Sequence, residues 1–268
     1  MKLITYPERK DWGTLLKRPT FDTSALEAKV KTVLQDVKLN GDEAVKKYTQ
    51  QFDGVVLNEI KVTSEEIASA TAFVSEELKK AIQIAVNNIT AFHRAQVSQV
   101  EIIETMPDVK CWRKSVGIEK VGIYIPGGTS PLFSTVLMLA IPAKIAGCKE
   151  IVLCTPPDRN GNINPAILYA ANITGVSTIY KIGGVQAIAS MAYGTETVPQ
   201  VYKIFGPGNQ YVTCAKQLIQ QEGIAIDMPA GPSEVCVMAD GSVNPTFVAA
   251  DLLSQAEHGV DSQVLLVT

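Results

Sequence analysis

From residue 121 onward the sequence alternates short apolar runs with longer stretches of helical pattern, and this alternation limits the possible folds most. The apolar runs end in glycine or proline turns, as in VGIYIPGG, EIVLCTPP, STIYKIGG, VYKIFGPGN and GIAIDMPAG. Helical patterns lie between them at residues 133–146, 165–174, 185–193 and 209–221. Strands separated by helices of about ten to fifteen residues are typical of βαβ units, so the sequence predicts an α/β fold with a parallel sheet.

The segments on either side have different patterns. The first hundred residues have apolar positions at helical spacing, which predicts an N-terminal helical region. After Pro232 the sequence gives one more strand (EVCVMAD), a helix over residues 245–257 and a final apolar run (SQVLLVT). A strand is an unusual chain end, so we expect the sequence to be part of a longer protein.

Composition excludes several classes of protein. The 268 residues carry a formal net charge of −3, which gives no electrostatic reason to expect binding to nucleic acid or to an anionic membrane. The longest apolar stretch, residues 132–147, is shorter than the ~20 residues of a membrane span. The first residues do not have the pattern of a signal peptide, so we expect a cytoplasmic protein.

The cysteines indicate a reducing compartment. Their number is odd, no CxxC motif occurs, and all but the first lie among apolar neighbours. We therefore expect reduced and mostly buried thiols. The cysteines are Cys111, Cys148, Cys154, Cys214 and Cys236.

Three glycine-rich turns follow predicted strands, at residues 126–128, 183–184 and 206–209. In open α/β sheets, ligands bind in the crevice at the carboxyl ends of the strands. Backbone without side chains can approach a phosphate there, and the start of the next helix favours an anion. None of the turns is GxGxxG, so the pattern leaves open both a nucleotide site and three ordinary turns.

Four polar side chains in or next to the loops that follow the strands are candidate ligand contacts, and each has an ordinary structural alternative. Tyr124 precedes the first turn and could simply pack in its strand. Gln186 follows the second turn and could be exposed or contact the start of its helix. Asn209 could merely cap its helix. Ser233, in the loop DMPAGPSE, could be an ordinary loop residue.

The segment DLLSQAEHG carries a candidate metal site. Gln255 and His258 are three residues apart and therefore share one face of a helix. An amide oxygen and an imidazole nitrogen could both bind Zn²⁺. The alternative for His258 is a favourable interaction with the helix dipole. Two ligands do not complete a zinc site, and the other histidine, His93, is expected to be structural.

The stretches VGIYIPGG, PLFSTVLMLAIPAKIAGC, GGVQAIA, KIFGPGNQYVT, IDMPAGPSEV and DLLSQAEHG together resemble the histidinol dehydrogenase family. The resemblance covers most of residues 20–268. It implies the NAD-dependent four-electron oxidation of L-histidinol to L-histidine through histidinal, the last step of histidine biosynthesis, by a zinc-containing homodimer. It further implies that Tyr124, Gln186 and Asn209 contact NAD, that Gln255 and His258 bind zinc and substrate, and that Ser233 contacts histidinol.

The resemblance also implies what lies outside these residues. The family's acid–base Glu-His pair and two further zinc ligands follow Thr268, so we expect no catalytic residue here and an incomplete, inactive chain. Glu257 and His258 are not that pair, because they lie in the zinc-ligand motif. Two alternatives remain: a non-catalytic fragment that binds NAD or dimerises, and an aldehyde dehydrogenase that uses a cysteine thiolate.

The expected architecture is two incomplete Rossmann-like units. Residues 1–120 would form the helical region and the start of a first unit, and residues 121–231 a second unit on the NAD side. Residues 232–268 would return to the first unit with the zinc-ligand helix, and that unit would be truncated at its C-terminus.

Overall fold

A computed structural model describes residues 2–17, 24–127, 131–229, 234–257 and 262–268. They belong to two compact units: residues 24–229 form the larger unit, and residues 1–23 together with 230–268 form the smaller unit. Among the described helices, none is long and apolar enough to cross a membrane.

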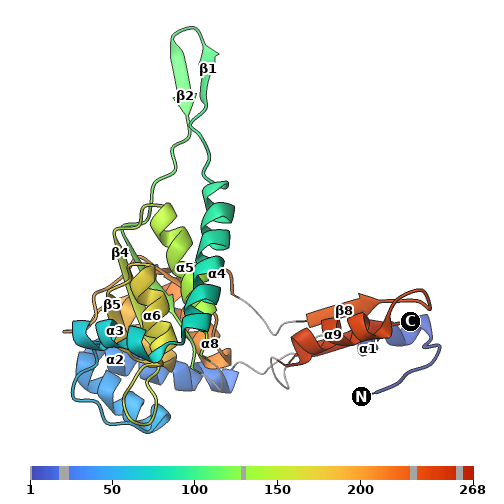
Figure 1. The fold of residues 1–268 in the computed structure, drawn as a ribbon, viewed down its shortest axis with the longest axis horizontal. Coiled ribbons are helices and arrows are strands. Elements are labelled where there is room, and N and C mark those ends of the chain that lie inside the picture. Colours follow the sequence, from blue (N-terminus) through green and yellow to red (C-terminus); the bar gives the residue numbers. More distant parts are fainter. Residues whose placement is uncertain (1, 18–23, 128–130, 230–233, 258–261) are drawn as a thin grey trace. The chain divides into compact units, whose positions relative to one another are not determined.

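A parallel five-stranded sheet forms the centre of the larger unit, in the order β5-β4-β3-β6-β7 (Figure 1). Strand β3 lies beside both β4 and β6, so the chain adds later strands first on one side of β3 and then on the other. This reversal of the strand order is typical of doubly wound α/β folds. This confirms the predicted α/β fold with a parallel sheet. The strands are β3 (Lys120–Tyr124), β4 (Glu150–Thr155), β5 (Thr178–Lys181), β6 (Lys203–Phe205) and β7 (Ala225–Ile226).

Helices connect the strands at the predicted places. Asn164 caps one of them, with Pro165 in its first turn, and Asn209 caps another, so local sequence determines where both begin. Gly122 allows close packing of a helix on the sheet, since a Cβ there would lie 2.6 Å from Met191 Sδ. The connecting helices are α5 (Phe133–Ile145), α6 (Pro165–Ile173), α7 (Gly184–Tyr193) and α8 (Gln210–Gln221).

Both faces of the sheet are covered, which explains why its strands are continuous apolar runs. One hydrophobic cluster joins α2 (Ser24–Asp53) to α7 and α8. The other joins α3 (Ser64–Ala70) and α4 (Glu76–Arg94) to α5 and α6, with the short 3₁₀ turn η2 (Thr71–Phe73) beside α3.

The N-terminal helical region has the predicted form. Helix α2 contains one break, at Gly41, whose φ of 49° and ψ of −130° are not helical. Gly41 therefore separates two helical segments. Thr63 and Glu66 form a capping box at the start of α3.

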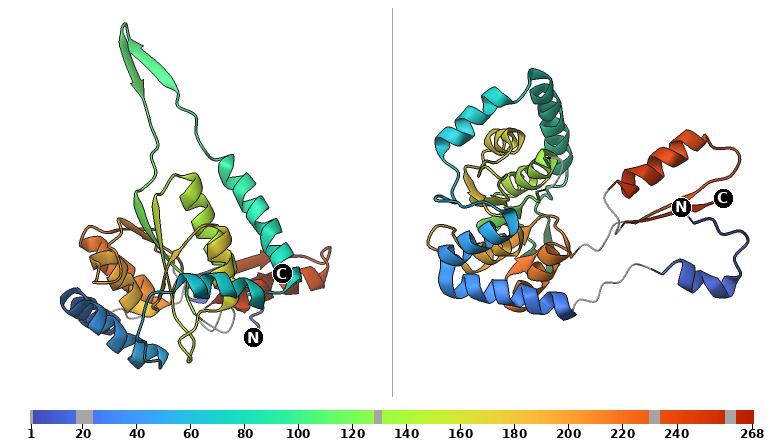
Figure 2. Two further views of the ribbon diagram at one scale, coloured as in Figure 1. Left: turned by 60° about the vertical axis from the view of Figure 1, so that its left-hand side comes forward. Right: turned by 90° about the horizontal axis from the view of Figure 1, so that it is seen from below.

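The hairpin of β1 (Ile102–Met106) and β2 (Val109–Trp112) is antiparallel and extends away from the five-stranded sheet (Figures 1 and 2). All of its strand residues are exposed.

The smaller unit contains one βαβ motif: β8 (Glu234–Met238) pairs in parallel with β9 (Gln263–Val267), and α9 (Pro245–Ala256) connects them. This confirms the strand, helix and strand predicted after Pro232. Its N-terminal part has a 3₁₀ turn, η1 (Arg9–Asp11), and a short helix, α1 (Trp12–Leu15). None of the described residues of this unit is buried.

The predicted division at residues 120/121 and 231/232 stays a prediction. In the structure, α2, α3 and α4 belong to the same compact unit as the five-stranded sheet.

Candidate functional site

The carboxyl ends of β3 and β6 lie side by side where the strand order changes direction, and this is where open α/β sheets bind ligands. Gly206 follows β6 with a φ of 131°. A Cβ at this position would collide with the backbone carbonyl of Tyr124. The third glycine-rich turn is therefore required by a close approach of two strand ends.

A partly buried ion pair holds this turn in place. Lys216 Nζ donates to the Gly206 carbonyl at 2.8 Å and pairs with Asp227, whose other oxygen accepts from the Gly206 N–H at 2.8 Å. Sequence reasoning missed both residues. Lys216 lies within an ordinary helical stretch, and Asp227 resembles any polar loop residue, so only the fold brings them together.

Tyr124 is buried and ends β3, as predicted for a strand tyrosine. Its hydroxyl oxygen accepts from the Gly184 N–H at 3.0 Å, at the start of α7. Burial raises the pKa of Tyr124 to about 12, so the phenol stays protonated at neutral pH. Its O–H proton can be donated to a ligand at this edge of the sheet.

Gln186 is fully buried, which excludes the solvent-exposed alternative. Its Nε2 lies 3.5 Å from Asp53 Oδ2. Its Oε1 is buried and has no hydrogen-bond partner among the described residues. An unsatisfied buried acceptor costs about 1–3 kcal/mol, which is the kind of cost tolerated where a ligand donor completes the hydrogen bond.

Asp53 is a further site residue that sequence reasoning missed. It ends α2. A Cβ at Gly183 would lie 3.3 Å from its Oδ1, which places the carboxyl beside the second glycine-rich turn and Gln186. Burial raises the pKa of Asp53 to about 6. A partly desolvated carboxylate is a ready acceptor for ligand hydroxyl or amide groups.

Asn209 caps α8, so the structural alternative from the sequence is confirmed. Its Oδ1 accepts from the backbone N–H groups of Tyr211 and Val212, both at 3.1 Å. The side chain is exposed, and its Nδ2 still has donor capacity. Capping and ligand contact are therefore compatible at this residue.

Only part of the predicted zinc and substrate site lies within the described residues. Gln255 is half-buried near the end of α9, and its Nε2 donates to Ser262 Oγ at 3.4 Å. His258 and Ser233 lie outside the described residues. Within the described ranges, no group of three or more His, Cys, Asp or Glu side chains could hold a metal ion. The described residues thus contain one candidate ligand and do not by themselves form a zinc site.

Three of the cysteines are in surroundings that disfavour a thiolate nucleophile. Cys154 and Cys214 are buried and Cys148 is half-buried, and burial raises the pKa of all three thiols, which keeps them protonated. Cys236, expected to be buried from its apolar neighbours, is exposed on β8, because in the described structure this strand has a parallel neighbour but no fully covered face. Cys111 is also exposed, in the hairpin.

Comparison with known proteins identifies the family. A family model described as histidinol dehydrogenase matches residues 16–268. A histidinol dehydrogenase from Bacteroides thetaiotaomicron is 65% identical over 268 residues, which are all of this chain and 63% of that protein. One from Colwellia psychrerythraea is 51% identical over 265 residues, which are 98% of this chain and 61% of that protein.

A solved structure supports the same relationship. The crystal structure of histidinol dehydrogenase from Elizabethkingia anophelis matches with a TM-score of 0.92 at 59% sequence identity, over 97% of this chain and 60% of that one. The chain thus spans about three fifths of the length of these relatives. A match of this extent and identity shows that the chain belongs to the histidinol dehydrogenase family.

Proposed function

We propose that this chain forms the dinucleotide-binding part of an enzyme that oxidises L-histidinol to L-histidine through histidinal, with NAD and zinc as cofactors. The observation that carries the proposal is the unsatisfied Oε1 of Gln186 beside the carboxyl ends of the strands. Family membership supports the reaction, because relatives that match the whole chain are named histidinol dehydrogenases. NAD, when bound, supplies the hydride acceptor.

Three side chains have complementary roles towards the dinucleotide in this proposal. Gln186 Oε1 accepts from a donor group of NAD, and the Tyr124 hydroxyl, positioned by the Gly184 N–H, donates to an acceptor. Asn209 Nδ2 donates while its Oδ1 continues to cap α8. Gly206 allows the ends of β3 and β6 to lie close together, since a Cβ there would collide with the Tyr124 carbonyl.

For the metal, we propose that Gln255 and His258 provide two zinc ligands and contact the substrate, and that Ser233 contacts histidinol. The fit rests on the donor types, because an amide oxygen and an imidazole are suitable zinc ligands. The only described partner of the Gln255 side chain is Ser262 Oγ, and that bond uses Nε2, so no described hydrogen bond occupies the Oε1 that would bind a metal ion. Zinc, when bound, would hold the amino and imidazole groups of the substrate.

The same proposal extends to architecture and assembly. The β8–α9–β9 motif would belong to the first of two incomplete Rossmann-like units and residues 121–231 to the second, in a cytoplasmic homodimer. The parallel pairing of β8 with β9 supports the first part, since a parallel pair joined by a helix is the building block of such units.

The test is NAD binding to this chain by calorimetry, together with histidinol-dependent NADH formation by the full-length enzyme with zinc supplied. Gln186→Leu keeps the side-chain volume but removes the acceptor, and we expect it to weaken NAD binding about tenfold or more. Gln217→Leu, on the exposed face of α8, is the matched control and should bind as the wild type does. Unchanged NAD affinity in Gln186→Leu would overturn the assignment.

The same assays separate the alternatives. NAD binding by this chain, with no turnover by the full-length protein, would favour a non-catalytic role over an enzyme. Activity that survives alanine substitution of each cysteine would exclude a thiolate mechanism, and the raised pKa values of Cys148, Cys154 and Cys214 lead us to expect this outcome.

A further inference from the structure

The third glycine-rich turn (residues 206–209) joins β6 to α8, and its first residue is buried just past the end of the strand pairing. The pairing of β6 with β7 ends at Ile204, and its pairing with β3 ends at Phe205. Within the described sheet, the backbone N–H and C=O of Gly206 therefore have no strand partner. Buried backbone groups need hydrogen bonds, so these two groups must find partners elsewhere in the fold.

Two side chains supply those partners. Asp227 accepts from the Gly206 N–H at 2.8 Å, and Lys216 Nζ donates to the Gly206 carbonyl at 2.8 Å. Lys216 and Asp227 also pair with each other, which closes a ring of contacts around one glycine. Gly206 has a φ of 131°, which glycine adopts readily and other residues rarely do, so the ring fixes a backbone geometry that the sheet does not set.

Both partners of Gly206 are fixed to other elements. The backbone N–H of Asp227 donates to the Ile204 carbonyl at 3.1 Å, which continues the contact between β6 and β7 past the end of β7. Lys216 lies in the middle of α8 and is buried. The beginning of the turn is thus tied both to the helix that follows it and to the strand beside it.

The end of the same turn is fixed by Asn209. Its Oδ1 caps α8 through the N–H groups of Tyr211 and Val212, both at 3.1 Å. A Cβ at Gly208 would collide with the Val212 side chain, so the turn also lies close against the start of α8. Since both ends of the turn are bound to α8, the position of the Asn209 Nδ2 donor depends on how Gly206 is held.

Apolar contacts already hold α8 on the larger unit. Val212, Ala215, Leu218 and Ile219 are buried in the hydrophobic cluster that includes α2 and α7. Burying two charges costs about as much free energy as their attraction returns, so an ion pair adds little to this packing. The pair of Lys216 with Asp227 is therefore better explained by the turn geometry that it sets.

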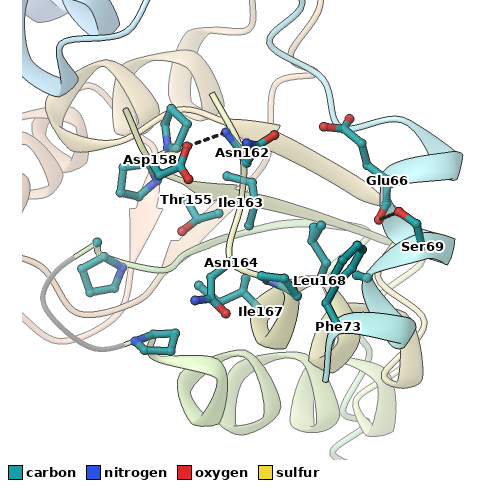
Figure 3. A pocket seen from close by; sticks show the side chains of 17 residues that line it. Glu66, Ser69, Phe73, Thr155, Asp158, Asn162, Ile163, Asn164, Ile167 and Leu168 are labelled. Carbon is teal, nitrogen blue, oxygen red and sulfur yellow. Dashed lines mark hydrogen bonds between the residues drawn. The ribbon is translucent and has the colours of Figure 1, made fainter. Parts of the chain in front are cut away.

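A second lysine–carboxylate pair has similar burial and also binds a backbone N–H. Lys181 Nζ lies 2.5 Å from Glu66 Oε1, and the other Glu66 oxygen accepts from the Thr63 N–H at 2.8 Å. Figure 3 shows Glu66 on α3, where it lines a cavity of about 640 Å³. That carboxylate belongs to the capping box of α3, so the pair fixes a helix start. The pair at Gly206 instead fixes a turn that carries a candidate ligand contact.

We propose that Lys216 and Asp227 are positioning residues for the dinucleotide. They hold Gly206 so that the turn presents Asn209 Nδ2 to NAD already in the free protein, and binding then requires little reordering of the turn. Neither side chain needs to contact the ligand itself. The inference rests on the proposed function, because it takes Asn209 as a contact of NAD.

The first test removes the lysine donor and keeps its apolar stem. In Lys216→Met the Gly206 carbonyl loses its bond, while Asp227, whose side chain is 28% exposed, can be hydrated and still holds the Gly206 N–H. We expect the Kd of this chain for NAD, measured by calorimetry, to rise about fivefold. Lys38→Met is the matched control, because Lys38 pairs with Glu222 at the opposite end of α8, and it should bind NAD as the wild type does.

Turnover by the full-length enzyme distinguishes positioning from general support of the fold. If Lys216 sets the conformation of the turn, KM for NAD in Lys216→Met should rise by the same factor as Kd, with kcat at saturating NAD within about twofold of the wild type. If Lys216 only stabilises the fold, kcat should fall with the folded fraction while KM stays unchanged. That second result would overturn the proposal.

Asn209→Ser tests whether the ion pair acts through Asn209. Serine retains the helix cap but removes the Nδ2 donor. Adding Lys216→Met to this variant should raise the Kd for NAD by less than about twofold, since the donor that Lys216 positions is already gone. A further rise of about fivefold would mean that Lys216 affects NAD binding by another route, and would contradict the proposal.

The outcomes separate this inference from the proposed function. A wild-type chain that binds no NAD would contradict the proposed function itself. Wild-type affinity for NAD in Lys216→Met would overturn the positioning role and leave the proposed function standing.

Discussion

Strands β3 and β8 have similar apolar sequences and a parallel neighbour each, yet their surroundings differ. In β3 every residue after Lys120 is buried, whereas in β8 the residues alternate between exposed and half-buried. The larger unit covers both faces of its sheet with helices, and the described part of the smaller unit has a single helix on two strands. Similar apolar strands therefore become a rigid platform for a site only when other elements cover them.

The largest expected effect is at the turn where β3 and β6 meet. Gly206→Ala should lower the free energy of unfolding by about 3 kcal/mol or more and abolish NAD binding, because the new methyl group collides with the Tyr124 carbonyl at an unfavourable φ. Gly241→Ala, in the smaller unit, has open space around its Cβ and should change stability by less than about 0.5 kcal/mol. Urea denaturation measures both, and equal effects would contradict the comparison.

A core substitution in each parallel pair tests the difference in burial directly. Ile123→Ala, in the centre of β3, should cost about 2–5 kcal/mol, since it opens a cavity among fully buried side chains. Val235→Ala, at a half-buried position of β8, should cost less than about 1 kcal/mol. A large loss at Val235 would mean that β8 is covered by something beyond the described residues.

Much of the fold follows from sequence patterns because those patterns are local. Apolar runs, capping residues and glycine turns predict the elements from α2 to β9 with small differences in their bounds, including Asn209 at the start of α8. Strand order is not local, so the meeting of β3 with β6 could not be predicted. The side chain that bonds Gly206 lies far from it along the sequence, and Asp53 lies far from Gln186. Neither contact could therefore be predicted from local patterns.

Burial also has to be read from the structure. Cys154 and Cys236 both lie in apolar strands, but only Cys154 is buried, because its strand lies in the middle of a covered sheet. The sequence pattern records that a strand is apolar and does not record which elements cover it.

A smaller effect is expected from the pH dependence of Asp53. Its pKa is raised from 3.8 to about 6, so the folded protein binds this proton more tightly than the unfolded chain does, and stability is lost as the pH rises between these values. Asp53→Asn should therefore be more stable than the wild type at pH 7 by about 1 kcal/mol, allowing for solvent screening, with no difference below about pH 4.

Asp240, an acidic residue of the smaller unit, should change stability with pH in the opposite direction. Hydrogen bonds from Ser242 lower the pKa of Asp240, so its contribution to stability is present at neutral pH and is lost on acidification. Asp240→Asn should thus lower stability at pH 7, while Asp53→Asn raises it. Denaturation curves across this pH range measure both, and the same sign for the two variants would exclude the proposed desolvation of Asp53.

The smallest effect on stability is expected at the zinc-ligand helix. The test there compares the free energy of unfolding with the amount of zinc retained. Gln255 is half-buried, and its one described bond, to Ser262, is long at 3.4 Å, so Gln255→Ala should change the free energy of unfolding by less than about 0.5 kcal/mol. Zinc retained by the complete enzyme after dialysis should nevertheless fall, as it should in His258→Asn, because each variant removes a proposed ligand. Gln263→Ala, on neighbouring β9, should retain zinc as the wild type does. A stability loss at Gln255 with full zinc retention would make this residue a structural part of α9 and leave the ligand role to others.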